Sequence, residues 1–120
     1  MRLHALRGAI TCTEDSKSEI EEKTQRLVKE LLARNEVEHD DLVSVIFTMT
    51  SDLRSEFPAT AARSVGLGDV PLLCARELEI DHGMARCIRV LVHCYSDRRR
   101  DELHHVYLEG ARALRDDLPE

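Results

Sequence analysis

The chain has 120 residues and a formal net charge of −6, from 23 acidic side chains against 17 lysines and arginines. This negative balance disfavours general binding to nucleic acids or to anionic membranes, so any site for an anion has to be built locally from a few arginines. Hydrophobic residues make up 42% of the chain, with two phenylalanines, two tyrosines and no tryptophan. We therefore expect one domain, residues 1–120, with an aliphatic core.

Neither a leader peptide nor a membrane span is predicted. Arg7 interrupts the first apolar stretch, and no apolar run approaches the roughly 20 residues that a membrane helix needs. We therefore expect a cytoplasmic protein. The cysteines have no C-x-x-C spacing, and we expect reduced, mostly buried thiols. They are Cys12, Cys74, Cys87 and Cys94.

The first two elements are predicted to be a strand and a long helix. Residues 2–12 alternate between two faces, with Leu6 and Ile10 on one face and Arg7 on the other. Residues 16–35 begin with a Ser-Lys-Ser-Glu sequence that fits a capping box, and they carry one apolar stripe. The stripe consists of Ile20, Leu27, Val28, Leu31 and Leu32. Such a helix is expected to cover one face of a sheet.

The middle of the chain is predicted to form two more strands around a short helix. Residues 41–50 alternate as a strand, and a short helix is expected over residues 58–66. A third strand is expected over residues 70–80. One face of the strand over residues 41–50 carries Val43, Val45 and Phe47.

The fourth predicted strand, residues 86–95, holds an arginine among aliphatic residues. Arg89 stands between Ile88 and Val90, where a covered strand is expected. An unpaired buried charge loses several kcal/mol of hydration, and arginine cannot escape by losing its proton because its pKa is above roughly 12. Arg89 must therefore meet an anion. Either the protein supplies it, with Glu77 as the candidate, or a ligand does.

The last part of the chain is ambiguous from its pattern alone. Residues 103–114 fit either a strand or a helix, because both repeats place apolar residues on one side. Residues 111–120 become increasingly polar, and we expect them to form a mobile tail.

Four or five strands and one long helix predict an α+β fold, with the helix on one face of a mixed sheet. The other face carries Arg7 and, by alternation, Arg89. This face would be uncovered in a monomer, which favours the packing of subunits against it. Two guanidinium groups at such a junction, with Glu77 and Tyr107 beside them, suit a small dicarboxylate ligand.

The spacing of the candidate residues disfavours a zinc site, a nucleophilic cysteine and a phosphate-binding loop. Zinc ligands usually follow patterns that are absent here, and neighbouring residues on a strand point to opposite faces. The neighbouring candidates are His93–Cys94 and His104–His105. Cys74 has no histidine marked beside it, so a nucleophilic role is disfavoured. The Gly-Leu-Gly-Asp sequence lacks the lysine and spacing of a phosphate-binding loop and is expected to form a turn.

Five sequence blocks fall in the order and spacing of a known enzyme family. They are RGAITCTEDSKSEI near the N-terminus, SDLRSEFPATAAR at 51–63, VPLLCARELEI at 70–80, ARCIRVLVH at 85–93 and HVYLEGARALRDDL at 105–118. Across essentially the whole chain they resemble the monofunctional, trimeric class of chorismate mutase. The resemblance implies a homotrimeric pseudo-α/β-barrel with sites at subunit interfaces. It also implies a five-stranded mixed sheet packed on one long helix, with HVYLE as the fifth strand.

The reaction that the resemblance implies is the conversion of chorismate to prephenate, on the route to phenylalanine and tyrosine. This [3,3] rearrangement is intramolecular, so we expect no nucleophile, metal or cofactor. The enzyme has to hold the side chain of chorismate over its ring and stabilise negative charge that develops on the ether oxygen. A fixed cation such as Arg89 suits the second task, and its planar fork also suits a carboxylate.

The resemblance assigns roles to particular residues. Arg7 and Tyr107 match positions that hold the side-chain carboxylate, and Arg89 matches the contact to the ether oxygen. Glu77 and Cys74 match contacts to the ring hydroxyl. The wall and rim of the pocket match Phe57, Ala59, Arg63, Leu72, Leu73, Leu114 and Arg115.

Two positions depart from the family pattern, and one spacing is unusual. Thr60 stands where lysine is frequent, and Leu73 stands where a small polar residue is common. Cys74 and Glu77 are three residues apart, so a regular strand would point them to opposite faces. If both contact one ligand, the strand has to bend, bulge or end between them.

Two other functions fit parts of the pattern. A non-catalytic trimer would use the same arginines to bind a small carboxylate for regulation. A related trimeric fold deaminates reactive imines and also uses an arginine at a subunit interface, but its motifs are not found here.

Overall fold

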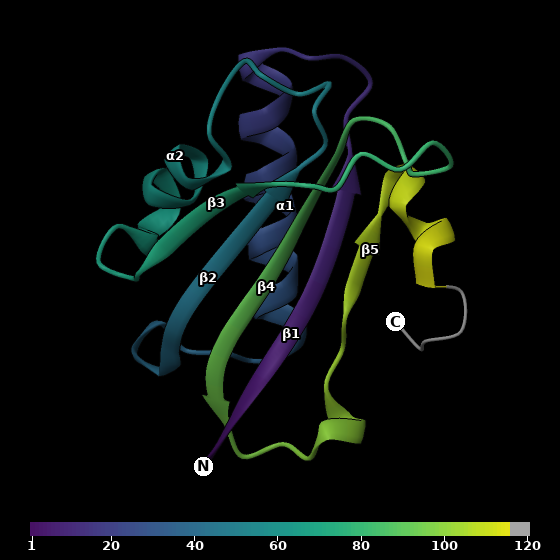
Figure 1. The fold of residues 1–120 in the computed structure, drawn as a ribbon. Helices are drawn as coiled ribbons and strands as arrows, with labels where there is room; N and C mark the ends of the chain where they lie inside the picture. Colours follow the sequence, from purple (N-terminus) through teal and green to yellow (C-terminus); the bar gives the residue numbers. More distant parts are fainter. Residues whose placement is uncertain (116–120) are drawn as a thin grey trace.

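The computed structural model describes residues 1–115. In this part of the chain, five strands form one mixed sheet in the order β3-β2-β4-β1-β5 (Figure 1). β4 is antiparallel to its neighbours β1 and β2, whereas β5 is parallel to β1 and β3 is parallel to β2. The strands are β1 (Arg2–Thr11), β2 (Leu42–Met49), β3 (Leu72–Arg76), β4 (Cys87–Ser96) and β5 (Val106–Leu108). The predicted α+β class is confirmed.

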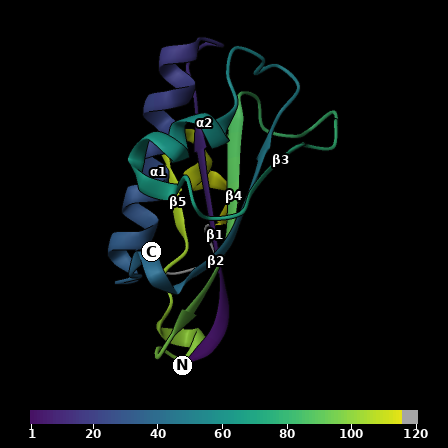
Figure 2. The same ribbon diagram turned by 90° about the vertical axis from the view of Figure 1, so that its left-hand side faces the viewer.

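The long helix α1 (Lys17–Arg34) and the short helix α2 (Pro58–Ala62) lie on the same side of the sheet (Figure 2). Ser16 caps α1, because its Oγ accepts the Glu19 N–H at 3.2 Å. The Glu19 carboxylate accepts the Thr13 N–H instead of the N–H of Ser16, so the predicted capping box is only half formed. Among the described residues, no helix has the length and apolar character needed to cross a bilayer.

The end of α1 is tied to the segment that leads into β5. The Asn35 side chain donates to the Leu31 carbonyl at 2.8 Å and to the His104 carbonyl at 2.7 Å. Its own oxygen accepts the His104 N–H at 2.7 Å. This buried amide therefore satisfies a helix-end carbonyl and fixes the approach to β5 at the same time.

The core fills the space between α1 and the sheet. Each large apolar side chain that is buried here stabilises the fold by about 1.5–3 kcal/mol. Those that are fully buried include Leu6, Ile10, Ile20, Leu27, Leu31, Phe47, Ile88 and Val92. Gly8 allows α1 and β5 to approach β1 closely, because a Cβ there would lie 3.1 Å from both Leu27 Cδ1 and the Val106 carbonyl oxygen.

The structure differs from the expected elements at two strands. Val43 was expected on the same face of β2 as Val45 and Phe47, but the register shifts between Leu42 and Ser44, and Val43 is exposed. A bulge of this kind breaks the alternation on which the expectation depends. β3 ends at Arg76, whereas the pattern extended the strand to residue 80. The fifth strand is confirmed at Val106–Leu108.

The last described segment is the 3₁₀ helix η4 (Glu109–Arg115). Glu109 Oε2 lies 2.7 Å from Arg26 Nη2 and 3.7 Å from Lys23 Nζ, so the segment is bound to α1. The Gly110 N–H donates to Thr11 Oγ1 at 2.9 Å, which also ties it to β1. Of the tail predicted over 111–120, residues 116–120 lie outside the described residues.

Candidate active site

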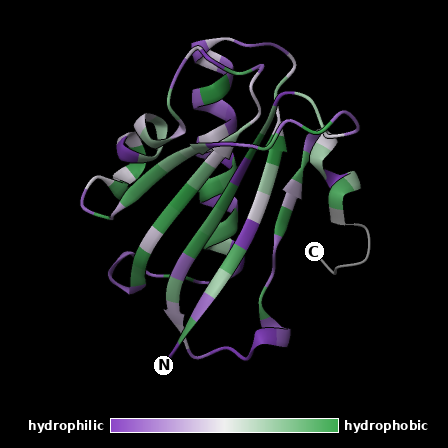
Figure 3. Ribbon diagram, viewed as in Figure 1, coloured by the Kyte–Doolittle hydropathy of each residue, from purple (hydrophilic) through white to green (hydrophobic). Residues whose placement is uncertain are grey.

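The face of the sheet turned away from the helices, here called the open face, carries polar side chains in the middle of the strands. Hydrophilic positions interrupt the otherwise hydrophobic central strands (Figure 3). Because Leu6 and Ile88 point into the core, alternation turns Arg7 and Arg89 to the open face. The register then places Arg89 between Ala9 of β1 and Thr48 of β2.

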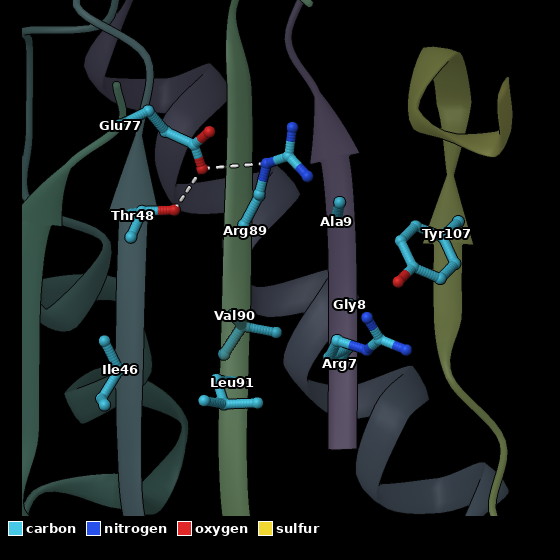
Figure 4. A pocket seen from close by; sticks show the side chains of 10 residues that line it. All are labelled: Arg7, Gly8, Ala9, Ile46, Thr48, Glu77, Arg89, Val90, Leu91 and Tyr107. Atoms are coloured by element: carbon cyan, nitrogen blue, oxygen red, sulfur yellow. Dashed lines mark hydrogen bonds and ion pairs between the residues drawn. The ribbon is translucent and has the colours of Figure 1, made fainter. Parts of the chain in front are cut away.

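A hollow of about 390 Å³ lies on this open face (Figure 4). Its size falls within the range of roughly 300–1,000 Å³ that small-molecule sites occupy. The lining residues are Arg7, Gly8, Ala9, Ile46, Thr48, Glu77, Arg89, Val90, Leu91 and Tyr107. The lining thus combines an aliphatic floor with two guanidinium groups, one carboxylate and one phenol.

The apolar neighbours of Arg89 suggested a buried position, but the structure places it on the face that was expected to be uncovered in a monomer. Its side chain is 41% exposed, because the open face has no covering element within residues 1–115. The protein supplies one anion, since Arg89 Nε lies 2.9 Å from Glu77 Oε2. The Nε–H is not aligned for a hydrogen bond, so this contact is an ion pair without a directed bond.

Glu77 is held in place from both its backbone and its side chain. Its N–H donates to the Met49 carbonyl at 2.9 Å, directly after β3 ends. Its Oε2 accepts the hydroxyl proton of Thr48 and faces Arg89 Nε (Figure 4). Since only Oε2 is engaged by these two groups, Oε1 remains available as a hydrogen-bond acceptor in the hollow.

Arg7 and Tyr107 face the hollow from the opposite side. The backbone N–H of Arg7 donates to His105 Nδ1 at 3.0 Å, whereas its guanidinium has no ion pair with any residue in 1–115. Tyr107 lies beside Ala9 in the parallel pairing of β5 with β1, and its ring is largely buried. These two residues thus present a cation and a phenol from neighbouring strands.

The charges of the hollow sum to about +1, from two guanidinium groups and one carboxylate, so it attracts a small anion. The nearby thiol adds no charge, because burial raises the pKa of Cys87 to about 11. Within residues 1–115, no three His, Cys, Asp or Glu side chains are grouped so that they could hold a metal ion.

The remaining predicted site residues do not line this hollow. Most of them form a second set near α2 and β3, here called the edge group: Phe57, Ala59, Arg63, Leu72, Leu73 and Cys74. Phe57 is 65% and Leu73 60% exposed, and Leu73 pairs with Ile46 on the open face. Thr60, on α2, is half-buried.

Cys74 and Glu77 point to opposite faces, as regular alternation requires. Cys74 pairs with the buried Phe47 and packs against the core, whereas Glu77 reaches the hollow. Within one chain, therefore, only Glu77 of this pair is placed to contact a ligand there. Near the end of the described chain, Leu114 packs against the small buried cluster that contains Tyr107 and Cys87. The Arg115 side chain lies outside what the structure describes.

Sequence reasoning missed several residues of the lining, above all Thr48. Since Val45 and Phe47 face the core, Ile46 and Thr48 have to face the other way. That signal was present in the sequence. What it could not give was the register that places Thr48 opposite Arg89 and one strand away from Glu77.

Comparisons with known proteins show the family to which the chain is related. The profile of the family described as chorismate mutase type I matches residues 3–118. Chorismate mutase AroH of Thermus thermophilus is 44% identical over 97% of this chain and 96% of its own length. The protein of the same name from Bacillus subtilis is 36% identical over 98% of this chain and 94% of its own.

A solved structure has the same fold. The structure of a chorismate mutase from Clostridium thermocellum superposes with a TM-score of 0.90 and 41% sequence identity, covering 92% of this chain and 98% of that one. A family profile over nearly the full length and relatives at this level of identity lead to one conclusion: the chain belongs to the chorismate mutase type I family.

Proposed function

We propose that the hollow on the open face binds chorismate and catalyses its rearrangement to prephenate, a step in the biosynthesis of aromatic amino acids. The observation that carries the proposal is that Arg7 and Arg89 both line one small cavity that holds a single carboxylate. A dianionic ligand is attracted to such a surplus of positive charge. Membership of the family supports the same reaction.

In this mechanism the side chains of the hollow act by position and by charge. Arg7 and Tyr107 hold the side-chain carboxylate and thus keep the substrate in the folded conformer that reacts. The ring hydroxyl donates to Glu77. Arg89 stabilises the negative charge that grows on the ether oxygen as the C–O bond breaks, while the new C–C bond forms within the same molecule. Because bonds break and form within one molecule, no proton has to be transferred.

We further propose that the chain forms a homotrimer in which each hollow is completed by the edge group of a neighbouring subunit. Two features support this arrangement. No residue of the edge group lines the hollow of its own chain, although the family pattern assigns both to one site. The open face and its margin also leave large apolar side chains exposed, namely Leu3, Phe57 and Leu73.

We also infer that the enzyme works in the cytoplasm. All cysteines of the chain lie in the described part, and each of them is a free thiol. Free thiols are typical of a reducing compartment.

The test is to mix the purified protein with chorismate and EDTA, without any cofactor, and to follow the loss of the ring-diene absorbance. Saturable formation of prephenate is expected. Arg89→Ala should lower kcat by at least roughly 100-fold, the scale for losing one donor to a developing oxyanion. Arg2→Ala removes the same charge from β1 outside the hollow and should leave kcat unchanged.

The main alternative is a non-catalytic protein that binds a small carboxylate for regulation. It would bind chorismate in a calorimetric titration, in a manner that depends on Arg7 and Arg89, without forming prephenate. If the folded protein binds chorismate but does not convert it, the regulatory binding protein is the correct interpretation and the enzyme is not.

A further inference from the structure

The contact between Arg89 and Glu77 is unusual in using a single guanidinium nitrogen. Arginine–carboxylate pairs frequently form two parallel hydrogen bonds, in which both oxygens of the carboxylate accept. Here Glu77 Oε2 lies 2.9 Å from Arg89 Nε, and no hydrogen bond joins the carboxylate to either terminal nitrogen of Arg89 (Figure 4). Something has to hold the carboxylate away from the fork of the guanidinium.

Thr48 is the residue that holds it. Its hydroxyl donates to the same oxygen, Glu77 Oε2, and binds it from β2 (Figure 4). Thr48 pairs with Ala75 of β3 on one side and with Arg89 of β4 on the other. Glu77 is two residues beyond Ala75, so both point to the open face and Glu77 can reach back over the small alanine side chain.

The side chain of Thr48 is suited to a fixed direction. A threonine has a restricted χ1 angle because its Cβ is branched, and the strand holds its backbone in the middle of the sheet. The hydroxyl carries one proton, and this proton is used in the bond to Glu77. Since a carboxylate is charged, this bond belongs to the stronger class of hydrogen bonds.

We propose that Thr48 is a positioning residue that acts through Glu77. By fixing Oε2, it leaves Oε1 to accept the hydroxyl of the ligand, and it keeps the terminal nitrogens of Arg89 available for the ligand's oxygens. Without the hydroxyl, the carboxylate turns onto the fork of Arg89 and neutralises the cation that the reaction needs. This inference rests on the proposed function and names a residue that the reaction needs although it need not touch the substrate.

The test is to compare Thr48→Val, which keeps the branched shape without the hydroxyl, with Thr48→Ser, which keeps the hydroxyl. We expect Thr48→Val to lower kcat by about tenfold or more, the scale for losing one hydrogen bond to a charged group, with a smaller change in KM. Thr48→Ser should keep most of the wild-type kcat. Both variants should keep the wild-type unfolding midpoint, because the change is on the open face. If Thr48→Val does not fold, Thr48→Ala replaces it in the same comparison.

A double-mutant cycle separates positioning from a merely structural role. If Thr48 acts through Glu77, Thr48→Val should cost little further activity in a Glu77→Gln background. Additive losses would overturn the inference, as would a Thr48→Val enzyme with wild-type kcat or a Thr48→Ser enzyme as slow as Thr48→Val. Wild-type protein is measured in the same assay, and the absence of turnover there would overturn the proposed function and this inference together.

Discussion

The two faces of the sheet are built from the same strands but have different physical properties. On the face toward α1, Leu6, Phe47 and Ile88 are fully buried in a close-packed aliphatic layer. On the open face, their immediate neighbours Arg7 and Arg89 present charges to a cavity. The covered face holds the backbone in place, and that rigid backbone fixes the spacing of the two guanidinium groups. Stability and activity should therefore respond to different sets of substitutions.

The largest effect on stability should come from the covered face. Phe47→Ala should lower the free energy of unfolding by about 3–5 kcal/mol, because it leaves a cavity beneath α1. Ile46→Ala, one residue away on the open face, is the matched control and should cost clearly less. Urea unfolding followed by circular dichroism measures both. Equal losses of unfolding free energy would mean that Ile46 is packed as well as Phe47. Another copy of the chain would then cover the open face in solution.

Mixed assemblies should show that the open face is completed by a neighbour. Arg89→Ala changes the hollow and Arg63→Glu changes the edge group, and each should be nearly inactive alone. If the two groups meet across an interface, equal amounts assembled together should regain about a quarter of the wild-type sites, because each site draws its two halves at random.

The control for this experiment pairs two changes in the hollow. Arg89→Ala assembled with Glu77→Ala should regain no activity, since no single chain then carries an intact hollow. Recovery in both mixtures, or in neither, would argue against sites that are shared between subunits.

A smaller effect is expected on the reactivity of the cysteines, which should follow how deeply each thiol is buried and not which face of the sheet it is on. Burial raises the pKa of Cys12 and Cys87 to about 11 and also raises that of Cys94. At pH 8 these thiols are almost entirely protonated and react slowly. Half-buried Cys74 should thus be alkylated first by iodoacetamide, as peptide mapping by mass spectrometry would reveal. Faster modification of Cys87 would show that η4 and β5 open readily over it.

The smallest effect is expected at the contact between η4 and α1. Arg26 and Lys23 hold the pKa of Glu109 below its usual value of 4.5, so the charged form of Glu109 favours the folded state. This contribution is present above that value and is lost as the pH falls through the lowered pKa. Glu109→Gln should lower the unfolding midpoint slightly at pH 7.

At an acid pH below the lowered pKa of Glu109, the difference between Glu109→Gln and the wild type should shrink, because Glu109 then gains its proton. Glu14→Gln removes an exposed carboxylate that makes no ion pair within residues 1–115, and it should have no such pH-dependent effect. A constant difference at both pH values would point to a cause other than charge.

The periodicity of apolar residues predicted correctly those elements in which a single helical or strand repeat determines which side chains are buried. The stripe on α1 and the alternation of β1 are both confirmed, because each is fixed by neighbours close in sequence. The exposed Val43 and the early end of β3 could not be predicted in this way, since they depend on how strands pair. Pairing is decided by residues that are distant in sequence.

The candidate site shows the same limit. Arg7, Arg89, Glu77 and Tyr107 were named from the sequence, and the structure brings them into one hollow, although their catalytic roles stay predictions. The apolar neighbours of Arg89 suggested a covered position, because they report only on the other face of the strand, whereas alternation placed Arg89 on the uncovered face, where its side chain is 41% exposed. Thr48 was missed because its importance comes from lying across from Arg89 and near Glu77.

The place of β1 in the sheet has a consequence for the synthesis of the chain. β1 is made first, yet it lies between β4 and β5, which are made last. Its backbone groups therefore wait for β4 until residue 96 has been made and for β5 until residue 108 has been made, and closing such distant contacts is slow. Among the elements made before β4, α1 is one that contacts β1 in the folded chain, so it can cover the apolar side of β1 during that interval. The helix that later supports the sheet thus also protects its first strand from aggregation.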